Sequence, residues 1–100
     1  MRYYIFISDS VKGDLRGVLA YDRRMLLDAI ESQLTYAPSL ETKKRTRLRN
    51  LVPPFHAIAP IWQLRVGMFR IFYDVNEHER RVYIRAIRRK PSHFTTEEIL

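Results

Sequence analysis

The sequence contains no cysteine, only three glycines and no long hydrophobic run. Without cysteine the chain can form neither disulfides nor thiolate metal sites, so nothing indicates an oxidising compartment. The apolar run Tyr3–Ile7 is soon followed by Asp9 and is too short for a signal peptide or a membrane span. We therefore expect a cytoplasmic protein without membrane contact, in which Tyr3–Ile7 forms a first strand.

The sequence also lacks the common motifs of several enzyme classes. No Gly-rich phosphate loop, no Ser-His-Asp set and no metal-ligand cluster is visible. We expect neither a metal nor a cofactor. The 100 residues are 46% hydrophobic and 29% charged, which is the composition of one globular domain.

The chain has a net charge of +7, and its positive charge is concentrated in the second part. Residues 1–41 carry five basic and six acidic side chains, whereas residues 42–100 carry thirteen basic and five acidic ones. The densest basic run is Lys43–Arg49. This asymmetry indicates a basic face for a polyanion, either a nucleic acid or an acidic protein partner.

Two helices are predicted after the first strand. The first is capped by Asp9 or Ser10, and the second covers residues 22–36 and ends before Pro38. We expect the two to form a helical hairpin across one face of a sheet. Their apolar positions recur at helical spacing: Val11, Leu15, Val18 and Leu19 in the first helix, and Leu26, Leu27, Ile30 and Leu34 in the second.

The rest of the sheet is predicted from Trp62–Val66, Phe69–Val75 and Val82–Arg88, which alternate apolar and polar residues. Residues 37–60 are expected to form a long irregular connection, and residues 95–100 carry a helix start signal. The order is β-α-α-β-β-β(-α). We expect an α+β fold in which the helical hairpin packs on one face of a mainly antiparallel four-stranded sheet and the other face stays open.

A tight turn at Gly67-Met68 predicts the register of the central hairpin. On the face that holds Leu64 opposite Ile71, we also expect Trp62, Phe69 and Tyr73 in the core. On the other face the same register sets Arg65 opposite Arg70. Like charges opposite each other weaken a sheet by up to roughly 1 kcal/mol. We interpret the pair as an anion site, with two solvated arginines on an open face as the alternative.

The segment Trp62–Val75 resembles the signature LR-x-G-x-x-R-x-x-Y-x-V of the RelE/ParE superfamily, the toxins of bacterial type II toxin–antitoxin modules. The resemblance extends through residues 23–34, Pro38–Thr42 and the strand end Arg88–Lys90, and so over nearly the whole chain. It implies a small cognate antitoxin as partner, with operator DNA contacted only through the antitoxin complex. RelE-like members cut mRNA on the ribosome, whereas ParE-like members inhibit DNA gyrase.

The resemblance also implies site residues for a metal-independent endoribonuclease. Arg70 matches a strand arginine that contacts the scissile phosphate, Arg65 a further basic position, and Lys90 a basic residue at the end of the last strand. An arginine suits this task because it is always charged and grips phosphate with two donors. The other basic residues are expected to bind nucleic acid: Lys43, Lys44, Arg45, Arg47, Arg49, Arg85, Arg88 and Arg89.

The general base stays open, because this chain departs from the RelE-like pattern. Ile61 and Gln63 stand where RelE-like nucleases carry lysines, and the tail has no tyrosine. His56 or His93 can replace the base, since an imidazole titrates near neutral pH, and a plain surface position is the alternative for each. The other possible substitutes are Lys43, Lys44 and Arg45, for which a solvated run that grips ribosomal RNA or the antitoxin is the alternative.

Two aromatic residues fall on the open face by their period. Phe72 and Tyr83 can stack there on an RNA base or pack beneath an antitoxin helix. Three functions therefore remain: ribosome-dependent mRNA cleavage, which we favour, gyrase inhibition, and antitoxin binding without toxicity.

Overall fold

The computed structural model describes residues 1–100 as a five-stranded sheet with three helices. The elements are, in chain order, β1 (Tyr4–Ile7), α1 (Asp9–Arg16), α2 (Ala20–Leu34), β2 (Arg45–Leu48), β3 (Ile61–Val66), β4 (Phe69–Asn76), β5 (Arg81–Arg89) and α3 (Thr96–Ile99). The strands lie in the order β1-β5-β4-β3-β2, and only β1 and β5 pair in parallel. The predicted α+β class is therefore confirmed. None of the helices has the length and apolar character needed to cross a membrane.

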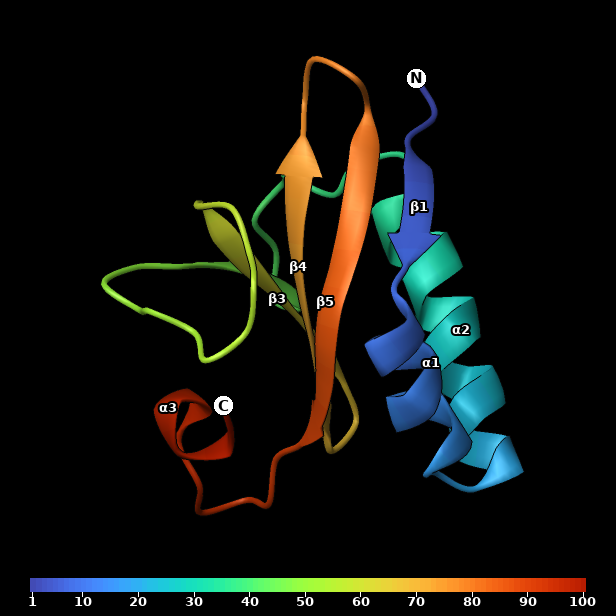
Figure 1. The fold of residues 1–100 in the computed structure, drawn as a ribbon, viewed down its shortest axis with the longest axis vertical. Helices are drawn as coiled ribbons and strands as arrows, with labels where there is room; N and C mark the ends of the chain where they lie inside the picture. Colours follow the sequence, from blue (N-terminus) through green and yellow to red (C-terminus); the bar gives the residue numbers. More distant parts are fainter.

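One face of the sheet is covered by α1 and α2 (Figure 1). The core forms where their apolar stripes meet alternate residues of β3, β4 and β5, because strand side chains point to opposite faces in turn. Trp62, Phe69 and Tyr73 are buried there, as predicted. The Tyr73 hydroxyl donates a 2.7 Å hydrogen bond to the carbonyl of Pro38, which fixes the start of the connection after α2.

The register of the central hairpin is also confirmed. Leu64 lies opposite Ile71, and Arg65 lies opposite Arg70. Gly67 occupies the first turn position with a φ of +57°, a conformation that glycine adopts without a steric penalty. The turn therefore sets both the buried pairs and the arginine pair.

The prediction of four strands is wrong, because β2 lies inside the basic run that was expected to be irregular. Arg45, Thr46, Arg47 and Leu48 pair with β3 at the edge of the sheet. Positively charged side chains are common on edge strands, where they discourage pairing with another chain. Here the charge masks the alternation that would otherwise indicate a strand.

The helix bounds differ from the prediction in detail. Ser8, rather than Asp9 or Ser10, caps α1 by accepting from the backbone N–H of Val11. The second helix begins and ends two residues earlier than expected. Leu19 and Leu27 are 75% and 39% exposed, so neither belongs to the buried stripes.

The second face, defined as the face opposite α1 and α2, is not fully open as predicted. The connection between β2 and β3 (residues 49–60) and the C-terminal α3 lie on this side (Figure 1). Asp74 accepts a 3.0 Å hydrogen bond from the Ile58 N–H, and the Phe55 ring packs 6.0 Å from that of Phe72. We call residues 49–60 the covering loop.

Candidate functional site

Three arginines lie side by side across the second face. Arg65 on β3 is the register partner of Arg70 on β4, which is in turn the partner of Arg88 on β5. Opposed residues of antiparallel strands have Cα atoms about 4.5–5.5 Å apart. Each arginine follows or precedes a residue of the core, so alternation places all three on the second face, and only Arg88 also reaches a helix, through Asp14 of α1. We call these residues the arginine row.

The electrostatics of the row favour an anion. Neither Arg65 nor Arg70 forms an ion pair. Burial, followed by the neighbouring charge of Arg65, lowers the pKa of Arg70 from its ordinary value. Arg88 is held 3.6 Å from Asp14 of α1 through its Nη1. Two of the three positive charges therefore lack a carboxylate partner in the protein.

The backbone places two lysines near the ends of the row. The carbonyl of Lys44 accepts a 2.8 Å hydrogen bond from the N–H of Arg65, which continues the β2–β3 pairing by one residue. Since Arg45 faces α2, alternation directs exposed Lys44 to the second face. Lys90 follows β5 directly and donates its backbone N–H to Met68 of the hairpin turn (2.6 Å). The sequence pattern alone does not place Lys44 beside Arg65, because the charged run hides the strand β2.

The tail brings an acid close to Lys90. The backbone and side chain of Thr95 lower the pKa of Glu98 through hydrogen bonds, and the charge of Lys90 lowers it further. Thr96 of α3 donates a 3.0 Å hydrogen bond to Gln63, the neighbour of the row on β3. The C-terminal residues therefore lie against one end of the candidate site.

The two candidate base residues lie on separate segments. His56 is exposed in the covering loop, next to Phe55, whose ring centroid is 5.9 Å from Arg88 Cζ. His93 is exposed between β5 and α3, with its ring 5.6 Å from that of Phe94. The contacts of Phe55 bring the covering loop to the arginine row, and no corresponding contact links His93 to it. No group of His, Asp and Glu side chains is arranged to hold a metal ion.

Two residues predicted to contact RNA are buried instead. Phe72 is fully buried beneath Phe55, so it has no free ring face for a base. Arg45 is 8% exposed, and its guanidinium donates to the carbonyls of Gln33 and Leu40 and to the Gln33 side chain. The guanidinium of Arg45 thus links β2 to the end of α2. The basic run Lys43–Arg49 in the sequence does not predict this structural role.

This correction gives a stability prediction. Replacing Arg45 with Met should lower the free energy of unfolding by about 2 kcal/mol, because it leaves the carbonyls of Gln33 and Leu40 without their donor. The matched control is Arg47→Met, two residues along the same strand and exposed. Urea unfolding of both variants checks it, and equal midpoints would contradict the structural role of Arg45.

The remaining predicted basic residues are placed differently. Arg85 is 17% exposed and forms a two-bond ion pair with Asp74, through Nε at 2.6 Å and Nη2 at 3.2 Å, so its charge is compensated. Arg49 pairs with Glu41 at 3.3 Å. Three others are exposed and form no ion pair: Lys43, Arg47 and Arg89.

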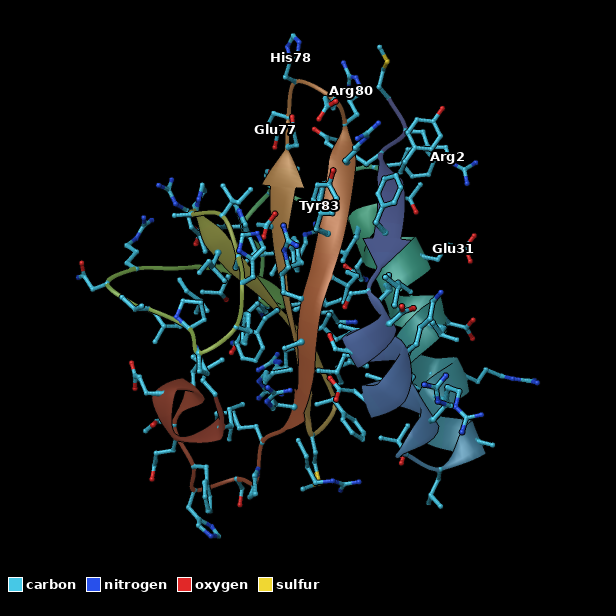
Figure 2. All side chains as sticks on the ribbon, viewed as in Figure 1. Arg2, Glu31, Glu77, His78, Arg80 and Tyr83 are labelled. Atoms are coloured by element: carbon cyan, nitrogen blue, oxygen red, sulfur yellow. The ribbon has the colours of Figure 1, made fainter.

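Tyr83 lies on β5 near the turn that carries His78 and Arg80, at the end of the sheet away from α3 (Figure 2). It is the register partner of Phe6 on β1 and stacks on it, with ring centroids 5.5 Å apart. Tyr83 precedes Arg88 by five residues, or roughly 17 Å along a strand. The structure therefore does not bring Tyr83 into the arginine row.

Comparisons with known proteins give one result, at the level of structure. No protein-family model and no curated protein sequence matches the chain. The toxin–antitoxin complex RelBE2 from Mycobacterium tuberculosis contains a chain that matches with a TM-score of 0.72, covering 90% of this chain and 100% of that one at 16% identity. The chain has a RelE-like fold. The archaeal RelE–RelB complex from Pyrococcus horikoshii OT3 matches with a TM-score of 0.70, covering 95% and 100% at 22% identity.

Within this RelE-like fold, the two positions where RelE-like nucleases are expected to carry lysines have other tasks. Ile61 is buried, and Gln63 accepts the hydrogen bond from Thr96. Neither side chain can be protonated or deprotonated in the neutral pH range. The candidate site therefore consists of cations that can hold a phosphate. No carboxyl or imidazole group is hydrogen-bonded to these cations.

Proposed function

We propose that this protein is the toxin of a type II toxin–antitoxin module and that it cleaves mRNA bound to the ribosome. The observation that carries the proposal is the arginine row, Arg65–Arg70–Arg88, on the second face of a RelE-like fold. A row of adjacent positive charges weakens the sheet, whereas it stabilises a phosphate that gains negative charge during reaction.

The proposed reaction breaks one P–O bond of the RNA backbone. The ribose 2′-oxygen attacks the adjacent phosphorus, the bond to the 5′-oxygen breaks, and a 2′,3′-cyclic phosphate and a free 5′-hydroxyl result. Arg65 and Arg70 donate to the non-bridging oxygens and stabilise the pentavalent transition state. Lys90, directly after β5, donates the proton that the leaving 5′-oxygen needs.

We propose His56 as the group that accepts the 2′-hydroxyl proton. The covering loop is fixed from two sides, by the Ile58 N–H on Asp74 and by Phe55 against Phe72 and Arg88. These contacts support a defined place for His56 beside the arginine row. His93 has no comparable anchor on that face.

Replacing His56 with alanine should therefore lower the single-turnover rate of cleavage by about 10²-fold, the lower end of what a general base contributes. His93→Ala is the matched control and should leave the rate within about twofold, since its imidazole is proposed to have no role in proton transfer. Rapid-quench measurements on ribosome-bound mRNA check both variants. A larger loss in His93→Ala than in His56→Ala would contradict the assignment.

The proposed partner is an antitoxin protein. The two structures compared above are toxin–antitoxin complexes, RelBE2 in one case and RelE–RelB in the other. The charge of this chain, thirteen basic against five acidic residues after position 41, suits an acidic partner segment. Ribosomal RNA and mRNA are the proposed nucleic-acid partners, and operator DNA would be bound only through the antitoxin complex.

One observation favours a second candidate function, inhibition of DNA gyrase without nuclease chemistry. Buried Ile61 and the amide Gln63 supply no acid or base where RelE-like nucleases carry lysines. Induction of the chain in growing cells discriminates between the two. Rapid loss of amino-acid incorporation supports the ribosome as target, whereas filamentation with continued protein synthesis would overturn the proposal in favour of gyrase.

A further inference from the structure

Two aromatic rings and two guanidinium groups lie together on the second face where β1 and β5 pair. The ring of Phe6 stacks on that of Tyr83 with centroids 5.5 Å apart and an interplanar angle of 24°. Arg81 Cζ lies 5.4 Å from the centroid of Phe6, and Arg85 Cζ lies 4.8 Å from that of Tyr83. We call these four side chains the aromatic stack.

Phe6 and the guanidinium of Arg81 form the exposed end of the stack. Tyr83 is half-buried between Phe6 and Arg85, whereas Phe6 is 44% exposed. The residues on either side of Phe6, Ile5 and Ile7, pack against the core, so the Phe6 ring points to the second face. An exposed ring and a planar guanidinium beside it together offer a surface on which an RNA base can stack.

We propose that the aromatic stack is a base-stacking subsite for single-stranded RNA, with Phe6 as the residue that receives the base. The inference rests on the proposed function, because it assumes that the bound RNA continues from the phosphate at the arginine row to the aromatic stack. Both features lie on the second face along β5, roughly 17 Å apart. At about 3.4 Å per stacked nucleotide, roughly five nucleotides span that distance.

The arginines of the aromatic stack already have acidic neighbours, which favours binding of a base by stacking over binding of a phosphate. Arg85 is paired with Asp74, and Arg81 lies 3.7 Å from Glu79 through its Nη1. Each of these two arginines therefore has a carboxylate partner, whereas Arg65 and Arg70 have none. A base stacked on Phe6 should add affinity that depends little on salt, in contrast to phosphate contacts.

The test measures binding of the purified full chain to uncleavable 2′-O-methyl oligonucleotides at several salt concentrations. Phe6→Leu keeps an apolar side chain and removes the flat ring, whereas Phe6→Tyr keeps the ring. Tyr21→Leu, which changes an exposed aromatic residue on α2, is the control for a general effect of losing a ring. Thermal unfolding of each variant reports whether the fold is kept.

We expect Phe6→Leu to bind a decanucleotide about tenfold more weakly at every salt concentration, with an unchanged salt slope. Phe6→Tyr and Tyr21→Leu should bind like the unaltered chain. With a dinucleotide, too short to reach both features, Phe6→Leu should also bind like the unaltered chain. A decanucleotide affinity of Phe6→Leu equal to that of the unaltered chain, or no binding by the unaltered chain, would overturn the subsite.

A failed subsite and a failed function give different results. If ribosome-dependent cleavage is present while Phe6→Leu binds RNA normally, the subsite is overturned and the nuclease proposal stands. If cleavage is absent while the length-dependent effect of Phe6→Leu is present, the nuclease proposal is overturned and an RNA-binding surface stands.

Discussion

Replacing Arg70 with alanine should reduce cleavage of ribosome-bound mRNA by about 10²–10³-fold, the usual loss when one donor to a transition-state anion is removed. Arg70 is the middle member of the arginine row, with Arg65 opposite it on β3 and Arg88 opposite it on β5. Its loss removes the charge closest to both neighbours. Single-turnover cleavage with saturating ribosome complex measures the effect on the chemical step.

Two further variants separate chemistry from general binding of nucleic acid. Arg70→Lys should recover only part of the rate, since lysine keeps the charge and loses the paired donors of arginine. Arg47→Ala removes an exposed charge from β2 outside the row, and it should leave the single-turnover rate within about twofold. Equal losses in Arg70→Ala and Arg47→Ala would show that cleavage follows total charge rather than the row.

Replacing Asp74 with alanine should lower the free energy of unfolding by about 3 kcal/mol. The change leaves Arg85 without its partner while that side chain is only 17% exposed. It also removes the acceptor of the Ile58 N–H, which holds the covering loop on the sheet. Chemical denaturation monitored through Trp62 in the core measures the loss.

The ion pair between Glu41 and Arg49 supplies the control for Asp74. It has a similar acid–arginine composition, but the two side chains are 49% and 64% exposed. Exposed pairs contribute between about 0 and 1 kcal/mol, so Glu41→Ala should change stability little. An Asp74→Ala variant as stable as Glu41→Ala would contradict the importance of the buried pair.

Much of the fold follows from local patterns in the sequence. The turn at Gly67-Met68 and the alternation on both sides of it predict the hairpin register, including Arg65 opposite Arg70. Helical spacing in residues 22–36 predicts the face of α2 that contacts the sheet, except at exposed Leu27. These features depend on neighbours a few residues apart, which is the range over which period and turn chemistry act.

Long-range contacts explain what the sequence could not predict. Arg45 lies in a run of basic residues, and it is buried because its guanidinium binds the carbonyl of Gln33 at the end of α2. Phe72 has the period of an outward residue, but Phe55 from the covering loop buries it. Arg88 joins the row through a shift in pairing between β4 and β5 at Phe72/Tyr73, which no residue pattern indicates. The catalytic roles proposed for Arg65, Arg70 and Lys90 stay predictions.

The most direct measurement of the central claim is a primer-extension map of mRNA in purified ribosome complexes, after incubation with this chain and, separately, with its Arg70→Ala variant. We expect cuts confined to the codon held by the ribosome with the unaltered chain, and none in naked mRNA. The cuts should be lost or strongly reduced with Arg70→Ala. If the chain arrests growth when it is expressed in cells but leaves mRNA in the purified ribosome complex intact, the account is contradicted.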